Sequence, residues 1–357
     1  MPYPFLGLGF NSWAQKFSRG NVSAAAATFL EYVTTSISSF TLRSTGTVDY
    51  EVDWGDGSTE SLTTNAPTHT YSSAGEYTIK ITPAEGSTYR PYFVSAVSDT
   101  SIKSISGTGG SQLGTNLLHA WYGASNMTSF SGDVDTSSVT NFGNTWRDCS
   151  SLTSFPSVDT SSGTSFIGTW QGCGGLTSFP ALDTSSVSIF SNTWRGCSGL
   201  TAFPSINTSS GTSFGGTWRQ CSSLTSFPAL DFSEATSVSE AWRECSSLVE
   251  FPSVDFSKVT TFRRTWIYSS SLTTFPADMF DTTGTLDSGA FQQAWTGSAL
   301  TAQSIENILT SLDTNGAQNI TLDINGGTNA AKTTWTTAAN TAYTNLINKG
   351  WTISYNA

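Results

Sequence analysis

The sequence predicts a mainly β protein with short helices, in which a β-sandwich, a repeat solenoid and an α/β cap follow one another. A tryptophan recurs every 24 residues from Trp146 to Trp266, and self-similarity at such a period marks a solenoid. A period-two alternation of apolar and polar residues precedes the repeats, and a longer helical period follows them. These patterns divide the chain into residues 1–36, 37–100, 101–298 and 299–357.

The composition argues against nucleic acids and membranes as partners. The 357 residues include 15 basic and 26 acidic side chains, and the net charge is −11. Phosphate backbones are bound through basic patches, so we expect no nucleic-acid partner. We see no secretory signal peptide and no apolar run that would span a bilayer, so we expect no membrane insertion. The many Ser, Thr and Gly residues are more typical of extracellular or particle-borne β proteins than of cytosolic enzymes.

Residues 1–36 are predicted to form an N-terminal anchoring arm, with a short helix around residues 23–33, where good helix formers occur. The segment 1–20 carries aromatic side chains but is too short to form its own core, and such groups are natural docking elements. We therefore expect the chain to be a homo-oligomer or part of a larger assembly. The candidate anchor residues are Phe5, Phe10, Trp13 and Phe17.

Residues 37–100 are predicted to form a β-sandwich, because apolar residues alternate with polar ones around Tyr50 and again around Ile79. The order VDWGDGS, HTY and GEYTIKI resembles that of the polycystic-kidney-disease-type (PKD) domain. This is an immunoglobulin-like module common in cell-surface and phage proteins. The resemblance implies a spacer or adhesion module without catalytic activity. Asp53 and Asp56 are expected to form Asx turns, with calcium binding as the alternative.

Residues 101–298 hold the repeats. Phe190, Trp194 and Cys197 have the spacing i, i+4, i+7, which predicts one face of a short helical turn. The three apolar residues that follow, beginning with Leu200, recur at every third position. This spacing predicts a coil that turns corners with one inward residue on each side. A proline within this run is predicted to end a short strand in each repeat.

The repeat resembles the BspA-like leucine-rich repeats of bacterial surface proteins. CSSLTS at residues 149–154 and DTSSVT at residues 135–140 match the recurring elements of that family. Tryptophan stands where many members have phenylalanine. The resemblance implies a leucine-rich-repeat solenoid, and it implies adhesion only as a class of function.

Two columns of equivalent residues are predicted to be structural. The five cysteines are expected to be buried free thiols, because side chains in register point in parallel; disulfide pairing and metal binding are the alternatives. An Asp column that includes Asn207 is expected to form Asx turns or caps, since an amide keeps a hydrogen-bonding role without a charge; a cation ladder is the alternative. These columns are Cys149, Cys173, Cys197, Cys221 and Cys245, and Asp135, Asp159, Asp183, Asn207, Asp231 and Asp255.

Two other columns are candidate partner-binding rows. The arginines that follow the tryptophans either pair with nearby acids or form a strip that binds a partner. The threonine row is either an ordinary strand surface or a hydroxyl ladder for glycans or ice. The rows comprise Arg147, Arg195, Arg219 and Arg243, and Thr153, Thr177, Thr201 and Thr225.

Residues 299–357 are predicted to cap the repeats with helices at 304–312 and 330–348 and strands at 320–324 and in the final WTISY. The stretch from GGTNAAK to the end resembles the C-terminal ends of structural proteins of marine tailed phages. His69 and His119 are the two histidines, and no nucleotide or metalloprotease motif occurs. We therefore expect no enzyme, no catalytic residue, no cofactor and no metal.

These observations favour a non-enzymatic phage virion structural protein, either a surface or decoration protein or a tail or fibre component. Its arm is expected to bind other virion proteins, and its solenoid to contact host surface glycans or proteins at the virion surface. The alternatives are an adhesin on a bacterial cell surface and a polysaccharide-degrading enzyme.

Overall fold

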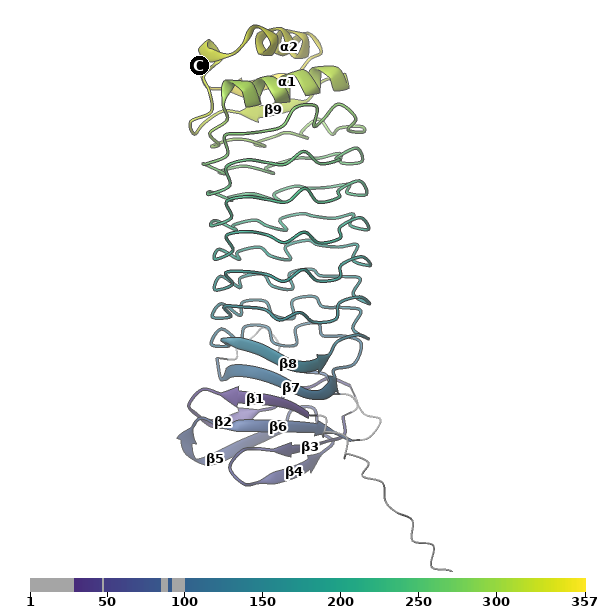
Figure 1. Ribbon diagram of the computed structural model, residues 1–357, viewed down its shortest axis with the longest axis vertical. Helices are drawn as coiled ribbons and strands as arrows, with labels where there is room; N and C mark the ends of the chain where they lie inside the picture. Colours follow the sequence, from purple (N-terminus) through teal and green to yellow (C-terminus); the bar gives the residue numbers. More distant parts are fainter. Residues whose placement is uncertain (1–28, 47, 85–88, 92–99) are drawn as a thin grey trace, which may run out of the picture.

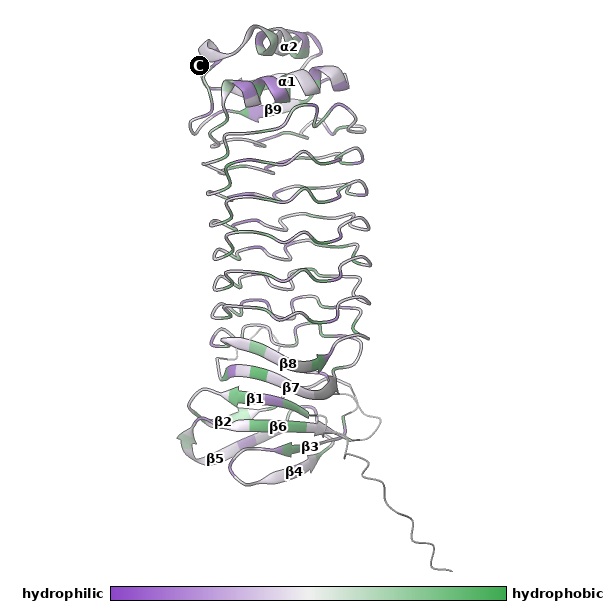
Figure 2. Ribbon diagram, viewed as in Figure 1, coloured by the Kyte–Doolittle hydropathy of each residue, from purple (hydrophilic) through white to green (hydrophobic). Residues whose placement is uncertain are grey.

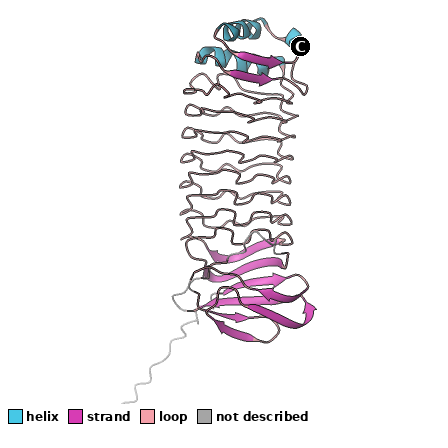
Figure 3. Ribbon diagram, turned by 180° about the vertical axis from the view of Figure 1, so that it is seen from behind, coloured by secondary structure: helices cyan, strands magenta, loops and turns pink. Residues whose placement is uncertain are grey.

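The computed structural model describes residues 29–46, 48–84, 89–91 and 100–357. A strand-rich N-terminal unit, a tall stack of coils and a small helical unit follow one another along the long axis (Figure 1). Named strands gather at the two ends, and the coils between them are irregular (Figure 3). The predicted anchor residues Phe5, Phe10, Trp13 and Phe17 lie outside the described residues.

The N-terminal unit contains two sheets. The smaller pairs β2 (Ile37–Thr41) with β5 (Thr68–Gly75), and the larger has the strand order β4-β3-β6-β1-β7-β8. Hydrophobic and hydrophilic segments both occur along these strands (Figure 2). Strands of the larger sheet are β1 (Phe29–Thr34), β3 (Tyr50–Asp53), β4 (Thr59–Leu62), β6 (Thr78–Pro83), β7 (Ile102–Gln112) and β8 (Ser129–Asp135).

The helix expected around residues 23–33 is wrong in its described part, because residues 29–33 belong to β1. Intermediate and buried residues alternate along β1, and the strand pairs with β6 on one side and β7 on the other. Two ladders and a buried face outweigh the weak helix propensity of this segment. The sandwich therefore begins ahead of residue 37, the boundary that the sequence predicted.

Each 24-residue circuit of the chain forms one coil of the stack. Parallel bridges join equivalent residues of neighbouring coils, so the repeats are in register. The bridged column is Asn116, Asn141, Ser165, Ile189, Ser213, Ser237 and Thr261. The short strands predicted before the prolines are reduced to single ladder contacts, such as the 3.3 Å bond from the Thr177 N–H to the Thr153 carbonyl.

The segment around each tryptophan is a chain of turns and not a helix. The N–H of Thr193 donates to the Phe190 carbonyl (3.1 Å), and that of Cys197 donates to the Trp194 carbonyl (3.1 Å). The N–H of Trp194 leaves the coil and donates to Thr217 in the next one (2.9 Å). Alternate N–H groups donate to carbonyls of the next coil and not within their own coil. The helical pattern of i to i−4 bonds therefore does not form. The predicted inward face is nevertheless present, since Phe190, Trp194 and Cys197 are all fully buried.

Columns of tryptophans and of phenylalanines fill the inside of the stack. The rings of neighbouring tryptophans lie 5.0 to 6.1 Å apart. A column of phenylalanines stands perpendicular to them, for example Phe203 at 4.8 Å and 75° from Trp194. Edge-to-face packing of this kind contributes beyond the buried area alone. The tryptophan column is Trp121, Trp146, Trp170, Trp194, Trp218, Trp242, Trp266 and Trp295.

The five cysteines are free and buried, as predicted. The Cys197 thiol donates to the carbonyl oxygen of Trp170, one coil back, at 3.2 Å. Ser269 takes the same position and donates to the Trp242 carbonyl at 3.0 Å. Cysteine and serine thus fill this column with small side chains that donate to the preceding coil, while Ala124 fills it in the first coil without a donor. Burial raises the pKa of the Cys221 thiol to about 12.

We expect the native protein to react with a disulfide reagent far more slowly than the denatured protein, because buried thiols with raised pKa values are rarely thiolates. In denaturant without reductant, five thiols should titrate. Fewer than five, with adventitious oxidation excluded by mass spectrometry, would contradict the free-thiol structure.

The Asp column forms Asx turns, as predicted. The Asp183 carboxylate accepts the Ser185 N–H at 3.0 Å and the Ser185 hydroxyl at 2.7 Å, and these bonds lower the pKa of that carboxyl. Asn207 makes the same two contacts with Ser209, at 3.1 and 2.8 Å. An amide replaces the carboxylate without loss of a bond, because the turn uses one side-chain oxygen.

The C-terminal unit closes one end of the stack. It contains α1 (Ala302–Asn315), β9 (Thr321–Ile324), a short 3-10 helix (Lys332–Thr334), α2 (Thr337–Asn348) and β10 (Thr352–Tyr355). The second helix begins later than the predicted residue 330. The reason is the extended Thr336, whose side chain accepts the Ala339 N–H and so defines the helix start.

Polar side chains of α1 bind the open backbone of the last coil. The Ser304 hydroxyl accepts the Phe275 N–H at 3.0 Å, and the Ser311 hydroxyl accepts the Phe280 N–H at 2.8 Å. Asn315 donates to the Phe280 carbonyl at 3.0 Å. The helix thus covers an edge that would otherwise expose unpaired backbone groups.

The sandwich closes the other end. β7 pairs antiparallel with β1 of the sandwich and parallel with β8, so the ladder continues from one unit into the next. The indole N–H of Trp121 donates to the buried hydroxyl of Tyr32 at 3.1 Å. The first member of the tryptophan column is therefore anchored on the sandwich.

Candidate functional site

Two positions in each coil have a positive φ, a conformation that L side chains rarely adopt. In the column two residues after the tryptophans, glycine stands at residues 172 and 196, and Asp148 has a φ of 60° in an earlier coil. Gln220, Glu244 and Tyr268 have φ values of 65°, 62° and 61° in three consecutive coils. A left-handed residue with a long side chain costs about 1–2 kcal/mol relative to the right-handed form. Such backbone outliers are a reason to look for function where they cluster.

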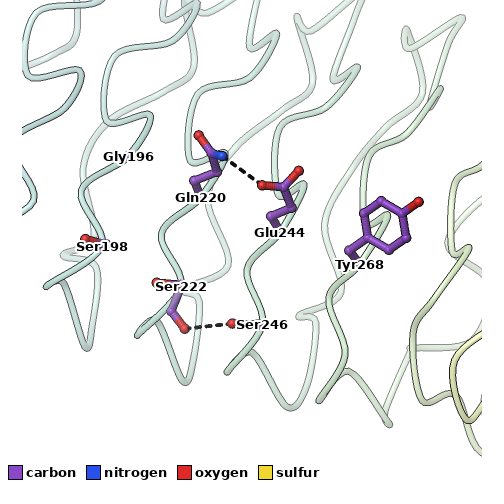
Figure 4. A pocket seen from close by; sticks show the side chains of 7 residues that line it. All are labelled: Gly196, Ser198, Gln220, Ser222, Glu244, Ser246 and Tyr268. Carbon is purple, nitrogen blue, oxygen red and sulfur yellow. Dashed lines mark hydrogen bonds between the residues drawn. The ribbon is translucent and has the colours of Figure 1, made fainter.

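A groove lies beside these three residues and runs across four coils (Figure 4). Its volume is about 480 Å³. Long side chains from the left-handed column form one side, and a row of serines forms the other (Figure 4). The lining residues are Gly196, Ser198, Gln220, Ser222, Glu244, Ser246 and Tyr268.

Hydrogen bonds hold the polar side of the groove in place. The Gln220 amide donates to Glu244 Oε2 at 2.8 Å, and Arg243 Nε donates to Glu244 Oε1 at 2.8 Å. Burial acts to raise the pKa of the Glu244 carboxyl, but the bonds from Arg243 and Gln220 outweigh it and lower that pKa. Glu244 is therefore a fixed acceptor, and each of its oxygens keeps a lone pair for a ligand.

Tyr268 forms the aromatic end of the groove and is 51% exposed. Its ring lies above Gly297 in the next coil, where an added Cβ would be only 2.7 Å from Tyr268 Cδ1. A glycine in that place gives the ring room to lie beside the backbone. Neighbouring residues thus accommodate an exposed aromatic side chain.

Most of the arginine row is engaged in ion pairs. Arg219 contacts Glu240 at 2.6 Å, Arg243 contacts Glu244 at 2.8 Å, and Arg147 contacts the adjacent Asp148 at 3.5 Å. Burial, and then the nearby Arg219, lower the pKa of Arg195. The acid-pairing alternative thus accounts for much of the row, while partner binding stays a prediction.

The threonine row is exposed, and several of its hydroxyls bind the stack itself. Thr177 Oγ1 donates to the Thr153 carbonyl at 3.4 Å, and Thr225 Oγ1 donates to the Thr201 carbonyl at 3.2 Å. These bonds supplement the backbone ladder between coils. Glycan binding by this row also stays a prediction.

The described acidic residues and the histidine of the sandwich form turns and short contacts. Asp53 accepts the Gly55 N–H at 2.9 Å and Asp56 accepts the Ser58 N–H at 3.0 Å, which confirms the predicted Asx turns. His69 Nε2 lies 2.8 Å from Asp56 Oδ2, and the Ser58 hydroxyl bonds to the same carboxylate and not to the imidazole. The imidazole of His69 is therefore not placed to take a proton from the Ser58 hydroxyl, as the general base of a catalytic triad would be.

Among the described residues, no group of three or more His, Cys, Asp or Glu side chains is placed to hold a metal ion. None of the helices in this part of the chain has both the length and the apolar composition needed to cross a membrane.

A comparison with models of protein families assigns the two-sheet unit that contains Asp53 and Asp56 to a known type of domain. Residues 23–88 match the PKD domain. The PKD domain thus includes β1 to β6, and β7 joins it to the coils. Comparisons with curated proteins and with solved structures find no match.

The groove was not predicted from the sequence. Its signal was present two residues after each tryptophan, where Gly172 and Gly196 are followed by Gln220, Glu244 and Tyr268 in the next three coils. A column of glycines predicts a positive φ, so larger residues in that column point to strained positions.

Proposed function

We propose that this chain is a non-enzymatic structural protein of a phage virion, a surface, decoration or tail or fibre component. In this proposal the coils are a BspA-like leucine-rich-repeat solenoid that presents a surface to the host or to the particle. The observation that carries it is the in-register stack, which has a groove lined by residues of four coils and is covered at both ends. Rigid repeat stacks commonly bind partners through such extended faces.

The absence of catalysis is part of the proposal. His69 serves an Asx turn through Asp56, and the cysteine thiols are buried with raised pKa values. Neither group is prepared as a nucleophile or base. The C-terminal resemblance to structural proteins of marine tailed phages supports the virion assignment.

A bacterial cell-surface adhesin is the second candidate. The PKD match favours it, because the sequence resemblance is to a module that is also common on cell surfaces. The two candidates differ in location: the first is expected on particles, the second on cells. Both use the same face of the coils for contact.

The experiment is deletion of residues 1–20, which precede β1. We expect the PKD domain and coils to keep their thermal transition, and incorporation into particles to be lost, because Phe5, Phe10, Trp13 and Phe17 supply the docking groups. Incorporation is measured by co-sedimentation with purified particles.

The undeleted chain with Ile167→Ala, an exposed coil position, is the control and should incorporate normally. Normal incorporation of the deletion variant would show that the arm is not the anchor, and recovery of the native chain only on bacterial cells would favour the adhesin.

A further inference from the structure

We propose that the groove at Gln220, Glu244 and Tyr268 binds a neutral, hydroxyl-rich glycan chain that lies along the stack. The inference rests on the proposed function for its biological setting, since a contact face of the coils is where a surface ligand would bind. It assigns the binding to this groove and not to the threonine or arginine rows.

The lining has the two kinds of group that a sugar ring needs. Tyr268 offers an exposed ring whose negative face attracts the C–H groups of a pyranose. Glu244 and Gln220 offer a planar carboxylate and a planar amide, fixed by the 2.8 Å bond between them, to receive and donate bonds to sugar hydroxyls. Polar groups that are already held in place lower the ordering cost of binding.

The shape of the groove favours a chain over a single sugar. It crosses four coils, and its serines repeat at Ser198, Ser222 and Ser246. Coils joined by parallel ladder contacts, as these are, lie about 4.8 Å apart. That distance is close to the advance of one hexose along an extended polysaccharide, so successive sugar units would meet equivalent groups of successive coils.

The charges favour a neutral ligand. Arg219 and Arg243 lie next to the groove, but both are paired, with Glu240 at 2.6 Å and with Glu244 at 2.8 Å. The lowered pKa of Glu244 keeps its carboxylate charged at neutral pH. A sulfated or uronic glycan would meet this carboxylate and a chain of net charge −11, whereas neutral hydroxyls would donate to it.

The test is isothermal titration calorimetry of the full chain with cellohexaose, laminarihexaose, maltohexaose and chitohexaose, and with heparin and alginate as anionic probes. We expect saturable binding of at least one neutral hexasaccharide and none of the anionic chains. Tyr268→Ala and Glu244→Gln should each weaken binding about tenfold or more, as for central contact residues.

The matched controls are Ile167→Ala, at an exposed apolar residue of the coils, and Asp148→Asn, at an acid in the same column as Glu244. Both residues lie outside the groove lining, so both variants should bind as the native protein does.

Tyr268→Gly separates binding from folding. Glycine relieves the positive φ, so the melting temperature should stay equal or rise while binding is lost. Absence of binding by all four neutral probes, binding restricted to the anionic probes, or unchanged binding by Tyr268→Gly and Glu244→Gln would each overturn the inference. Co-sedimentation with particles is measured separately, so a chain that incorporates but binds no neutral glycan would overturn this inference alone.

Discussion

Replacement of Trp194 by alanine should lower the free energy of unfolding by about 3–5 kcal/mol, the range for truncation of a buried aromatic residue. Trp194 is fully buried, and its ring lies 5.7 Å from Trp170 and 5.9 Å from Trp218. The cavity would interrupt the tryptophan column in the middle of the stack, where neighbouring coils cannot close over it without shifting their own ladder bonds. Urea denaturation followed by far-UV circular dichroism measures the change.

Trp194→Phe is the matched variant. It retains an aromatic ring and removes an indole N–H that is buried without a hydrogen-bond partner among the described residues. Since an unpaired buried donor is itself unfavourable, this variant should lose clearly less stability than Trp194→Ala. Trp13→Ala, in the predicted arm, should leave the transition unchanged. Equal midpoints for Trp194→Ala and Trp13→Ala would contradict the central role of the column.

Coils contact only their neighbours, so the damage should also be local. In such one-dimensional arrays, a weakened unit can separate the unfolding of the parts on either side. Trp194→Ala should therefore broaden the transition or divide it in two, and hydrogen exchange should rise first in coils next to residue 194.

The spacing of a few residue types was sufficient to predict that the repeats stack in register. Trp194 and Cys197 lie in columns because a 24-residue period brings equivalent residues into register. The presence of Asn207 among the aspartates led to the correct prediction of Asx turns. An amide keeps the hydrogen-bonding role of the carboxylate but not its charge. A column is informative because its residues occupy equivalent positions, so a substitution in one repeat shows which property that position needs.

Local propensity predicted less well than the columns. The segment at residues 29–33 favours a helix by composition, yet it forms β1 because β6 and β7 pair with it on both sides. Those partners lie far along the chain, and no local pattern reveals them. The turns around Trp194 were also missed: their apolar spacing fits a helix, while their N–H groups are shared with the next coil.

The candidate groove was the least predictable part. Serines at 198 and 222 are ordinary surface residues in the sequence, and the repeat pattern drew attention to Arg195 and Thr201. A groove arises only when strained residues in three consecutive coils project side chains to the same place. That requires the φ values and the handedness of the turns, which spacing alone does not supply.

Truncation after Ser298 should make the chain aggregate. The cut removes α1, whose Ile305, Ile308 and Leu309 are fully buried, and it uncovers Trp295 at the end of the tryptophan column. It also removes the hydroxyls of Ser304 and Ser311 that accept the last free N–H groups of the coils. Terminal caps with a polar outer face keep repeat arrays soluble, and open strand-like edges pair with other chains.

Size-exclusion chromatography with light scattering measures this effect directly. Because a truncated chain sometimes fails to fold for other reasons, Leu309→Ala provides a milder version, expected to lower the free energy of unfolding by about 2–5 kcal/mol while the full cap is present. Ile347→Ala, at an exposed position of α2, is its control and should change stability by less than about 0.5 kcal/mol. A truncated chain that does not aggregate, together with a Leu309→Ala variant as stable as the native protein, would show that the stack ends at Ser298 without help. The helices would then be an appendage, and the coils would have to satisfy the N–H groups of Phe275 and Phe280 through water alone.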